Sequence, residues 1–426
     1  MKKIFTLLTF LTATNIFATD RFVDPNLSAG NGTTLFTSIT SAVNAAVNGD
    51  RIIIASTTYN EPALTISKSL QIMPQTPGTI INFNANIIIS GFAGMKLEIT
   101  GFNLGIYSFS SNSITSGSYS NRAKITIIEC LATNVDFNND FYDTNIINNN
   151  FDGILVFKYG NIISNNINSV LLFDENLDSQ STTDKILITN NNISYILGIY
   201  NNNYRFVVAN NLLKNISVKR WNSETSIVNK IINNEFLDGA VFQMSWGSVP
   251  YYNIVFSSNK FNGSCSFNSH PTNYAGNIGN YGWYDTTVDY RQNFFCGAVW
   301  PNYDITAQTS SQSLYFPEPN VSGFFEWSYN GLNINCPVPS AGQPLALTRI
   351  IGPINDINGG NPNHNYYDID LTINDRGING GPYSQLNYNP TSNLNNSKAF
   401  IFDLDMPTDL FPGQSIDIKA KGYHKN

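Results

Sequence analysis

The sequence predicts an all-β solenoid, a chain wound into stacked coils, and three observations lead to this fold class. The first is a short repeat between residues 149 and 261, in which an Asn or Glu precedes a large apolar residue by two positions. The copies are Asn149/Phe151, Asn165/Ile167, Asn191/Ile193, Asn210/Leu212, Glu235 beside Asn234/Phe236, and Asn259/Phe261, with steps of 16, 26, 19, 24 and 25 residues. A period of roughly 20 residues with variable insertions is typical of solenoids, in which each repeat forms one turn.

The second observation is a series of short apolar runs that continues to about residue 300. Examples are Ile80–Ile81, Ile87–Ile89, Leu97–Ile99, Ile125–Ile128, Ile154–Phe157, Ile186–Ile188, Phe206–Val208 and Ile254–Phe256. These runs are too short for surface helices and predict parallel strands that are buried on one side.

The third observation is composition, since only 12% of the residues are charged and Asn is abundant. Like charges in stacked strands would line up about 4.8 Å apart and repel, whereas Asn side chains can form hydrogen-bonded ladders. Asn also tolerates the left-handed backbone of tight corners. The repeated Asn therefore indicates corners and core rather than a binding motif.

The N-terminus has the pattern of an export signal. Met1-Lys2-Lys3 is basic, residues 4–17 are apolar, and Ala18 is a small residue suited to cleavage. This apolar stretch is too short to span a bilayer. A lipid anchor at this point is not supported, because there is no Cys near Ala18. No later stretch reaches the roughly 18–20 apolar residues of a membrane helix. We therefore expect a signal peptide over residues 1–18 and a secreted, periplasmic or cell-surface protein without a transmembrane segment.

One helix is predicted, over residues 37–47, after a short strand over residues 21–24. Ile39, Val43, Ala46 and Val47 fall on one face of this helix, Thr37 can cap its start, and Asn48-Gly49 can end it. Four strands follow, over residues 51–55, 59–61, 64–66 and 70–72.

This opening carries a specific resemblance. The motifs V-D-P, a helix ending in N-G-D, the strand I-I-I-A, T-Y-N-E and I-S-K-S-L-Q-I resemble the start of secreted bacterial right-handed parallel β-helix proteins of the pectate-lyase-like superfamily. The resemblance implies a right-handed parallel β-helix over residues 19–345, with a short N-terminal capping helix and a C-terminal β-hairpin region within 346–426. The helix would cover the first coil, which otherwise exposes unpaired backbone and apolar interior.

The same resemblance implies polysaccharide lyase or hydrolase chemistry, but the catalytic motifs do not match. The hydrolases of the superfamily use clustered Asp with Gly-His-Gly and Arg-x-Lys, whereas His270, His364 and His424 stand in S-H-P, N-H-N and Y-H-K. The lyases use carboxylates that hold Ca²⁺ and a basic residue that abstracts a proton. Here Lys219-Arg220, beside Trp221 and near Glu224, is either such a base with a charge partner or a solvated turn.

Residues 365–384, N-Y-Y-D-I-D-L-T-I-N-D-R-G-I-N-G-G-P-Y-S, resemble a segment frequent near the end of such proteins. Asp368, Asp370, Asn374 and Asp375 place several hard oxygen ligands in one loop, so they form the candidate Ca²⁺ site. Asx turns that cap the fold are the alternative. Two alternating strands then predict a hairpin in which Asp403 and Asp405 lie near Lys419 and Lys421.

From residue 264 to 303 the repeat breaks into long loops rich in aromatic residues. Aromatic faces stack on sugar rings, so Trp246, Tyr281, Trp283, Tyr284 and Trp300 are the candidate ligand-binding residues, unless they only close loops over the coil. The four cysteines, Cys130, Cys265, Cys296 and Cys336, form no CxxC pair, which excludes common zinc and redox motifs. Cys265 and Cys296 flank the loop-rich insertion and are the candidate disulfide, while Cys130 is expected to be a buried small residue.

Three functions stay open at this point. The net charge of −7 argues against nucleic acid as a partner and disfavours a simple electrostatic grip on acidic polysaccharides. The first hypothesis is a secreted or cell-surface protein that binds a polysaccharide or another extracellular surface without catalysis. The second is a polysaccharide lyase with a divergent site, with Ca²⁺ as its possible cofactor. The third is a structural or adhesive spacer.

Overall fold

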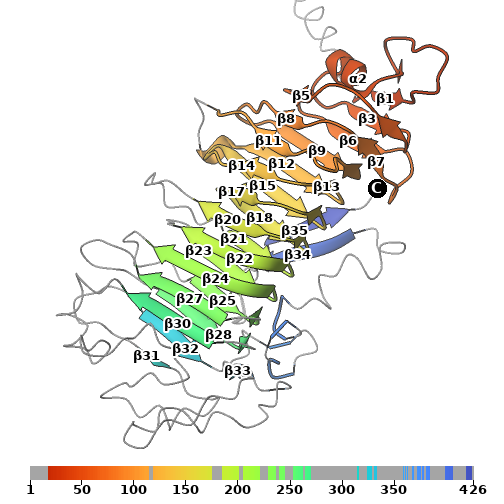
Figure 1. Cartoon of the computed structure of the whole chain (residues 1–426). Coiled ribbons are helices and arrows are strands. Elements are labelled where there is room, and N and C mark those ends of the chain that lie inside the picture. The colour runs from red at the N-terminus through yellow and green to blue at the C-terminus, as the bar shows by residue number, and fades with distance from the viewer. Residues whose placement is uncertain are drawn as a thin grey trace, which may run out of the picture.

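The computed structural model describes residues 18–114, 119–174, 185–200, 205–220, 229–236, 239–244, 253–261, 264–269, 314–315, 324–328, 331–332, 399–405 and 419–424, with separate positions between 358 and 383. Over these residues the chain forms a right-handed parallel β-helix, which confirms the predicted fold class (Figure 1). Each coil contributes one strand to each of three stacks, called here sheet A, row B1 and row B2.

Sheet A is one continuous stack along the molecule. Its strands, in spatial order, are β2 (Leu35–Phe36), β1 (Asp20–Val23), β3 (Arg51–Ile54), β6 (Gln71–Pro74), β9 (Lys96–Thr100), β12 (Ala123–Ile128), β15 (Tyr142–Ile147), β18 (Gly160–Ile163), β21 (Lys185–Thr189), β23 (Arg205–Ala209), β25 (Asn229–Ile232), β28 (Asn253–Ser257), β32 (Phe324–Ser328) and β31 (Leu314–Tyr315). All neighbours pair in parallel except β31, which pairs antiparallel with β32 and covers that edge.

Rows B1 and B2 follow sheet A in every coil. Row B1 contains β4 (Thr58–Tyr59), β7 (Ile81–Phe83), β10 (Phe102–Asn103), β13 (Leu131–Ala132), β16 (Asn150–Phe151), β19 (Asn166–Ile167), the starts of β22 (Asn192–Tyr200) and β24 (Leu212–Arg220), β26 (Glu235–Phe236), β29 (Lys260–Phe261) and β33 (Gly331–Leu332). Row B2 contains β5 (Leu64–Ile66), β8 (Ile87–Ile89), β11 (Phe109–Ser111), β14 (Val135–Phe137), β17 (Leu155–Phe157), β20 (Val170–Asp174), the ends of β22 and β24, β27 (Gly239–Met244) and β30 (Ser264–Ser269).

The interior of the coil is a single apolar core built from alternating residues. In the first coils the strands alternate, as in β3 and β6, where every second residue is buried. The inward residues include Ile52, Ile72, Phe83, Phe102 and Phe109, none more than 1% exposed. Burying one such large apolar side chain stabilises the folded state by about 1.5–3 kcal/mol.

Sheet A departs from the prediction that its strands are buried on one side. From β12 onward its outer face carries a second apolar cluster, called here the outer stripe: Ile128, Ile147, Ile163, Leu187, Val207, Ala209 and Ile232. These residues are at most 2% exposed, and Tyr383 from the C-terminal region packs against them. The apolar runs are continuous because both faces of these strands are buried.

Helix α2 (Ile39–Ala45) covers the first coil, as predicted, but is shorter than the predicted span of residues 37–47. Ser38 rather than Thr37 caps it, because the Ser38 side chain accepts a hydrogen bond from the N–H of Ser41. Ala46 has an extended backbone, so Val47 leaves the helical repeat and is 49% exposed, which corrects its predicted place on the buried face. Ile39, Ala42 and Val43 are buried.

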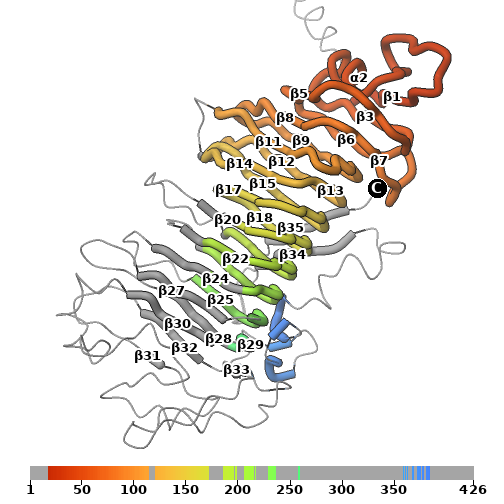
Figure 2. Tube along the Cα trace, viewed as in Figure 1, coloured from red at the N-terminus to blue at the C-terminus, as the bar shows by residue number. Residues whose placement is uncertain are grey.

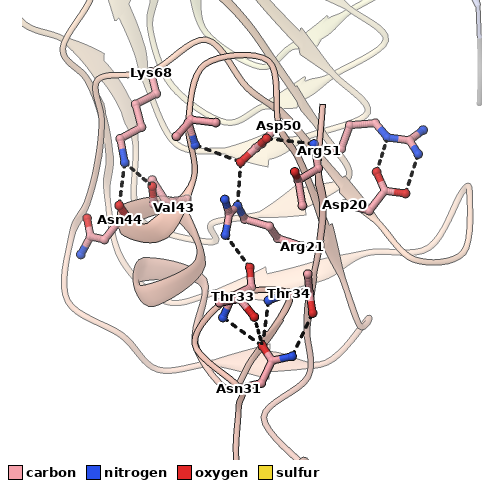
Figure 3. Close-up of polar contacts among 12 residues, drawn as sticks. Asp20, Arg21, Asn31, Thr33, Thr34, Val43, Asn44, Asp50, Arg51 and Lys68 are labelled. Carbon is pink, nitrogen blue, oxygen red and sulfur yellow. Dashed lines mark hydrogen bonds and ion pairs between the residues drawn. The ribbon is translucent and has the colours of Figure 1, made fainter. Parts of the chain in front are cut away.

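A buried ion pair joins the strand before this helix to the loop after it (Figure 3). Arg21 Nε lies 2.7 Å from Asp50 Oδ2, and the Asp50 side chain is fully buried. Asp50 also accepts the N–H groups of Thr19 and Val47, each at 2.9 Å. A second pair, between Arg51 and Asp20, is 2.6 Å long and partly exposed.

Three other predicted spans are refined by the structure. Strands β7 and β17 begin at Ile81 and Leu155, so Ile80 and Ile154 lie at the surface. The expected break at residue 264 comes later, because Ser264–Ser269 forms β30 and pairs with β27. Among the described residues, strands β32 and β33 follow it as part of a further coil.

The predicted terminal hairpin is confirmed. Strands β34 (Ala399–Asp405) and β35 (Lys419–His424) pair antiparallel, with Asp403 opposite Lys421 and Asp405 opposite Lys419. Within the described residues, Tyr119–Asn121 also forms a short 3₁₀ helix, η1. Figure 2 traces the coils from the N-terminal cap to β29. No helix in the described part of the chain is long and apolar enough to cross a membrane.

Candidate functional site

Polar side chains concentrate at the corner between sheet A and row B1. From β12 to β28, each described corner is a pair of residues, the first with a left-handed backbone and the second with a buried side chain. The first positions, with φ between 53° and 58°, are Glu129, Asn148, Ser164, Asn190, Asn210, Asn233 and Ser258. The second positions are Cys130, Asn149, Asn165, Asn191, Asn211, Asn234 and Asn259, all of them buried.

The buried asparagines form a continuous ladder from Asn149 to Asn259. Each Nδ2 donates to the Oδ1 of the next asparagine at 2.9–3.0 Å, and the backbone N–H of the same residue donates to that oxygen at 2.9–3.0 Å. The Nδ2 groups also donate to strand carbonyls, for example from Asn149 to Ile127 and Ile147 at 3.0 Å. The ladder therefore satisfies polar groups that would otherwise be buried without partners.

The ladder corrects the predicted repeat at one copy. Asn211 with Leu213, rather than Asn210 with Leu212, holds the inward positions, and the steps become 16, 26, 20, 23 and 25 residues. Asn210 is the left-handed corner residue. The sequence was compatible with both registers because Asn210 and Asn211 are adjacent and each precedes a leucine by two positions.

Cys130 begins the ladder in place of an asparagine. Its backbone N–H donates to Asn149 Oδ1 at 2.8 Å, and its Sγ accepts the N–H of Phe102 at 3.4 Å. Burial raises the pKa of this thiol to about 12, so the group stays protonated and can donate to the Ile128 carbonyl oxygen 3.2 Å away. The prediction of a buried small residue is confirmed, and its hydrogen-bonding role was not foreseen.

A second row of amides lies on the outer surface of row B1 and is called here the outer amide row. It consists of Asn82, Asn103, Asn150, Asn166 and Asn192, in register along the coils with Leu131 between Asn103 and Asn150. Adjacent amides are joined by Nδ2–Oδ1 hydrogen bonds of 2.9–3.0 Å. Because an amide offers two N–H donors and two acceptor lone pairs, each residue keeps capacity for an external ligand.

A segment of the C-terminal region docks on the corners at the far end of the ladder. Asn210 Nδ2 donates to the carbonyl oxygens of Ile378 and Gly380, at 3.0 and 2.6 Å. Asn233 and Asn374 exchange two amide hydrogen bonds, of 2.6 and 3.2 Å, and both residues are fully buried. The N–H of Gly377 donates to the Ser258 carbonyl at 2.9 Å.

The candidate Ca²⁺ ligands lie in this docked segment. Asp368 accepts the N–H groups of Asp375, at 3.2 Å, and of Gly381, while Asp375 Oδ1 accepts the N–H of Asn358 at 2.6 Å. The Asn374 amide faces Asn233 rather than Asp368, and Asp370 lies outside the described residues. Among the residues with described positions, no group of three His, Cys, Asp or Glu could hold a metal ion. The calcium site stays a prediction.

The remaining candidate residues are placed only in part. Trp246, Tyr281, Trp283, Tyr284 and Trp300 lie outside the described residues, as does Cys296. Cys265 belongs to β30, opposite Ala240 of β27. Lys219 and Arg220 end strand β24 and pair with Gln243 and Met244, so they lie in a strand and not in a turn, and the role of a catalytic base stays a prediction.

Sequence reasoning missed the docking corners because their partners lie far away in the chain. Asn233 and Asn374 are separated by 141 residues, and no local pattern connects them. In comparisons with known proteins, no family model, no curated protein and no solved structure matches this chain. Function is therefore inferred from the geometry of the described residues.

Proposed function

We propose that the protein is an extracellular β-helix protein that binds a polysaccharide through the outer amide row. The observation that carries this proposal is the row itself, in which Asn82, Asn103, Asn150, Asn166 and Asn192 lie on one surface and follow the axis of the solenoid. Parallel strands repeat about every 4.8 Å, so within its two parts, Asn82–Asn103 and Asn150–Asn166–Asn192, which Leu131 separates, the row presents regularly spaced donors and acceptors to a linear polymer.

Chemistry supports a ligand rich in hydroxyl groups. Amides both donate and accept hydrogen bonds, as sugar hydroxyls do, and they carry no charge. The net charge of −7 disfavours acidic polymers, so a neutral polysaccharide fits best. The export pattern of residues 1–18 and the resemblance of the opening motifs to secreted pectate-lyase-like β-helix proteins support an extracellular place of action.

Retention on insoluble neutral glycans tests the proposal. The test variant, Asn150→Ala/Asn166→Ala, removes one amide pair of 2.9 Å from the outer amide row. The control, Asn145→Ala/Asn161→Ala, removes an amide pair of 2.8 Å from the outer face of sheet A, where Asn161 is buried and out of reach of a polymer. We expect the test variant to lose retention at least fivefold while the control, checked for an intact fold by its melting temperature, binds as the unmodified protein does.

Two results would contradict the proposal. Equal retention of both variants would remove the outer amide row as the binding surface. A protein that binds no glycan at all would favour the spacer hypothesis instead.

Trp283→Ala/Trp300→Ala separately tests the predicted aromatic platform. Lyase action on uronate polymers would appear as an unsaturated product that absorbs in the ultraviolet.

A further inference from the structure

We propose that the described residues between 358 and 383, chiefly 372–375, 377, 378 and 380–383, form a latch, which binds to the corners of the solenoid and can release while the coils stay folded. Release would uncover apolar surface of the outer stripe. The latch contacts the left-handed corner residues, whose side chains point away from the buried ladder. Its release does not depend on glycan binding. Three features of the contact lead to it.

First, the latch forms hydrogen bonds with three successive corners. Asn210 binds two of its carbonyl oxygens, Asn233 binds the Asn374 side chain and the Asp375 carbonyl at 2.6 and 2.7 Å, and Ser258 accepts the N–H of Gly377. The side chains of Asn210 and Asn233 thus bind main-chain carbonyls of the latch, and the carbonyl of Ser258 binds a main-chain N–H of the latch. The left-handed backbone at these positions turns their side chains away from the core, where the ladder residues point.

Second, the latch has its own internal hydrogen bonds. Asp368 holds the N–H groups of Asp375 and Gly381, and its own N–H donates to the Thr372 carbonyl at 3.1 Å. Gly360 donates to the Asn374 carbonyl at 2.7 Å. A loop closed by such bonds can keep its shape when it leaves the surface to which it is docked.

Third, the latch is fitted closely to the corner by glycine. Gly381 has φ of 76°, and a Cβ at this position would lie 2.6 Å from Asn233 Oδ1. Close contact by side chains and glycines, without strand pairing, is weaker than the ladders of backbone bonds that join adjacent coils. Local opening therefore costs less than uncoiling.

The cover that the latch provides is apolar as well as polar. Tyr383 packs against the outer stripe, whose residues are at most 2% exposed. A sheet face made of Ile, Leu and Val would be a site of association if it were open to water. Covering the part of this face that Tyr383 contacts is the role that the latch would have.

Substitution by glycine tests the latch without disturbing the corners, because glycine adopts the left-handed backbone at no steric cost. The test variant is Asn210→Gly/Asn233→Gly, which removes the side-chain bonds to the latch. The matched control is Asn190→Gly, at φ of 57°, since neither atom of the Asn190 amide has a hydrogen-bond partner within the described structure. A third variant, Gly381→Ala, disturbs the contact from the side of the latch alone.

Hydrogen exchange and binding of a hydrophobic dye are the readouts. A hydrogen bond is worth about 1 kcal/mol, so we expect exchange in peptides covering 365–383 to rise at least tenfold in Asn210→Gly/Asn233→Gly, with increased dye binding. Peptides covering β3 and β12 should exchange as before, and Asn190→Gly should behave as the unmodified protein does. Gly381→Ala should reproduce the same changes.

Three results would overturn the proposal. The first is latch exchange equal to that of the Asn190→Gly control. The second is a parallel loss of protection in the coils, which would mean that latch and solenoid unfold together. The third is latch release without increased dye binding, which would mean that the outer stripe stays covered. If the double variant does not fold, Gly381→Ala decides between the outcomes.

Discussion

At the scale of the residue, asparagine performs three tasks at two of the corners. In the runs Asn148-Asn149-Asn150 and Asn190-Asn191-Asn192, the first residue takes the left-handed corner, the second enters the buried ladder, and the third joins the outer amide row. The amide suits all three tasks because it tolerates a positive φ, both donates and accepts, and carries no charge. An aspartate in the ladder would place like charges in adjacent coils.

The same versatility limits what the sequence could predict. The repeat identified the corners and the possibility of ladders, but it could not tell which asparagine of a run faces inward. At residues 210 and 211 the prediction chose the wrong one, because either choice preserves an apolar residue two positions later. Only the register of the paired strands separates the two.

We predict that Asn191→Ala destabilises the protein far more than Asn192→Ala. The Asn191 side chain accepts from the N–H and Nδ2 of Asn165 and donates to Ile162 and Asn211, so its loss leaves several buried groups without partners. Each such group costs about 1–3 kcal/mol, and we expect a loss of about 3 kcal/mol or more. For the exposed Asn192 we expect less than about 1 kcal/mol. Urea unfolding measures both, and similar losses would contradict a stabilising ladder.

At the scale of the element, the N-terminal helix shows how tertiary contacts set boundaries. Its apolar spacing predicted an end at Val47, but the Val47 N–H donates to Asp50 and the chain leaves the helix at Ala46. The Glu61 carboxylate accepts the N–H groups of Ile39 and Thr40 at 2.7 and 2.9 Å, and Lys68 donates to Val43 and Asn44 at the other end. These charges complement the helix dipole. They come from later coils, so local sequence could not reveal them.

We predict that the cap begins to lose stability as the pH falls below about 4, because Asp50 then binds a proton more readily in the unfolded chain than in the folded cap. Burial alone would raise the pKa of Asp50, but the N–H groups of Val47 and Thr19 and the Arg21 guanidinium outweigh it and hold the pKa below 3.8. A carboxyl group with a lowered folded pKa contributes stability above its unfolded pKa and loses it as the pH falls through the folded value.

Asp50→Asn should therefore lower the free energy of unfolding by about 3 kcal/mol at pH 7, because Arg21 is left buried without its charge partner. The variant should lose less stability on acidification than the unmodified protein, because it lacks the carboxyl group that titrates. The control is Asp20→Asn, which breaks the exposed pair with Arg51 and should cost less than about 1 kcal/mol. Thermal unfolding at pH 7 and pH 3 compares them. An equal pH dependence in the Asp50→Asn variant would show that other groups govern the acid response.

At the scale of the whole molecule, the sequence predicts how the coils stack along the axis of the solenoid. It does not predict which distant segments dock on the outside of the coils. Repeats and apolar runs predicted the stacking of coils, and the hairpin register of Asp403 with Lys421 followed from simple alternation. The docking of residues 374–380 on corners 210–258 joins parts of the chain more than 100 residues apart. Alternation cannot encode such a contact, so the second buried face of sheet A appeared in the sequence only as apolar runs without alternation.

Stacked coils also predict how damage spreads. Each coil pairs only with its neighbours, so stability in a solenoid is close to a sum of local and nearest-neighbour terms. We predict that Asn191→Ala raises hydrogen exchange most in β21–β24 and leaves α2 and β3 unchanged. Asp50→Asn should raise hydrogen exchange in α2, β1 and β3 and leave exchange in β25 unchanged. Exchange measured by mass spectrometry on both variants tests this. A uniform loss of protection in either variant would mean that the coils unfold as one cooperative block, because a local break would then remove the support of every coil at once.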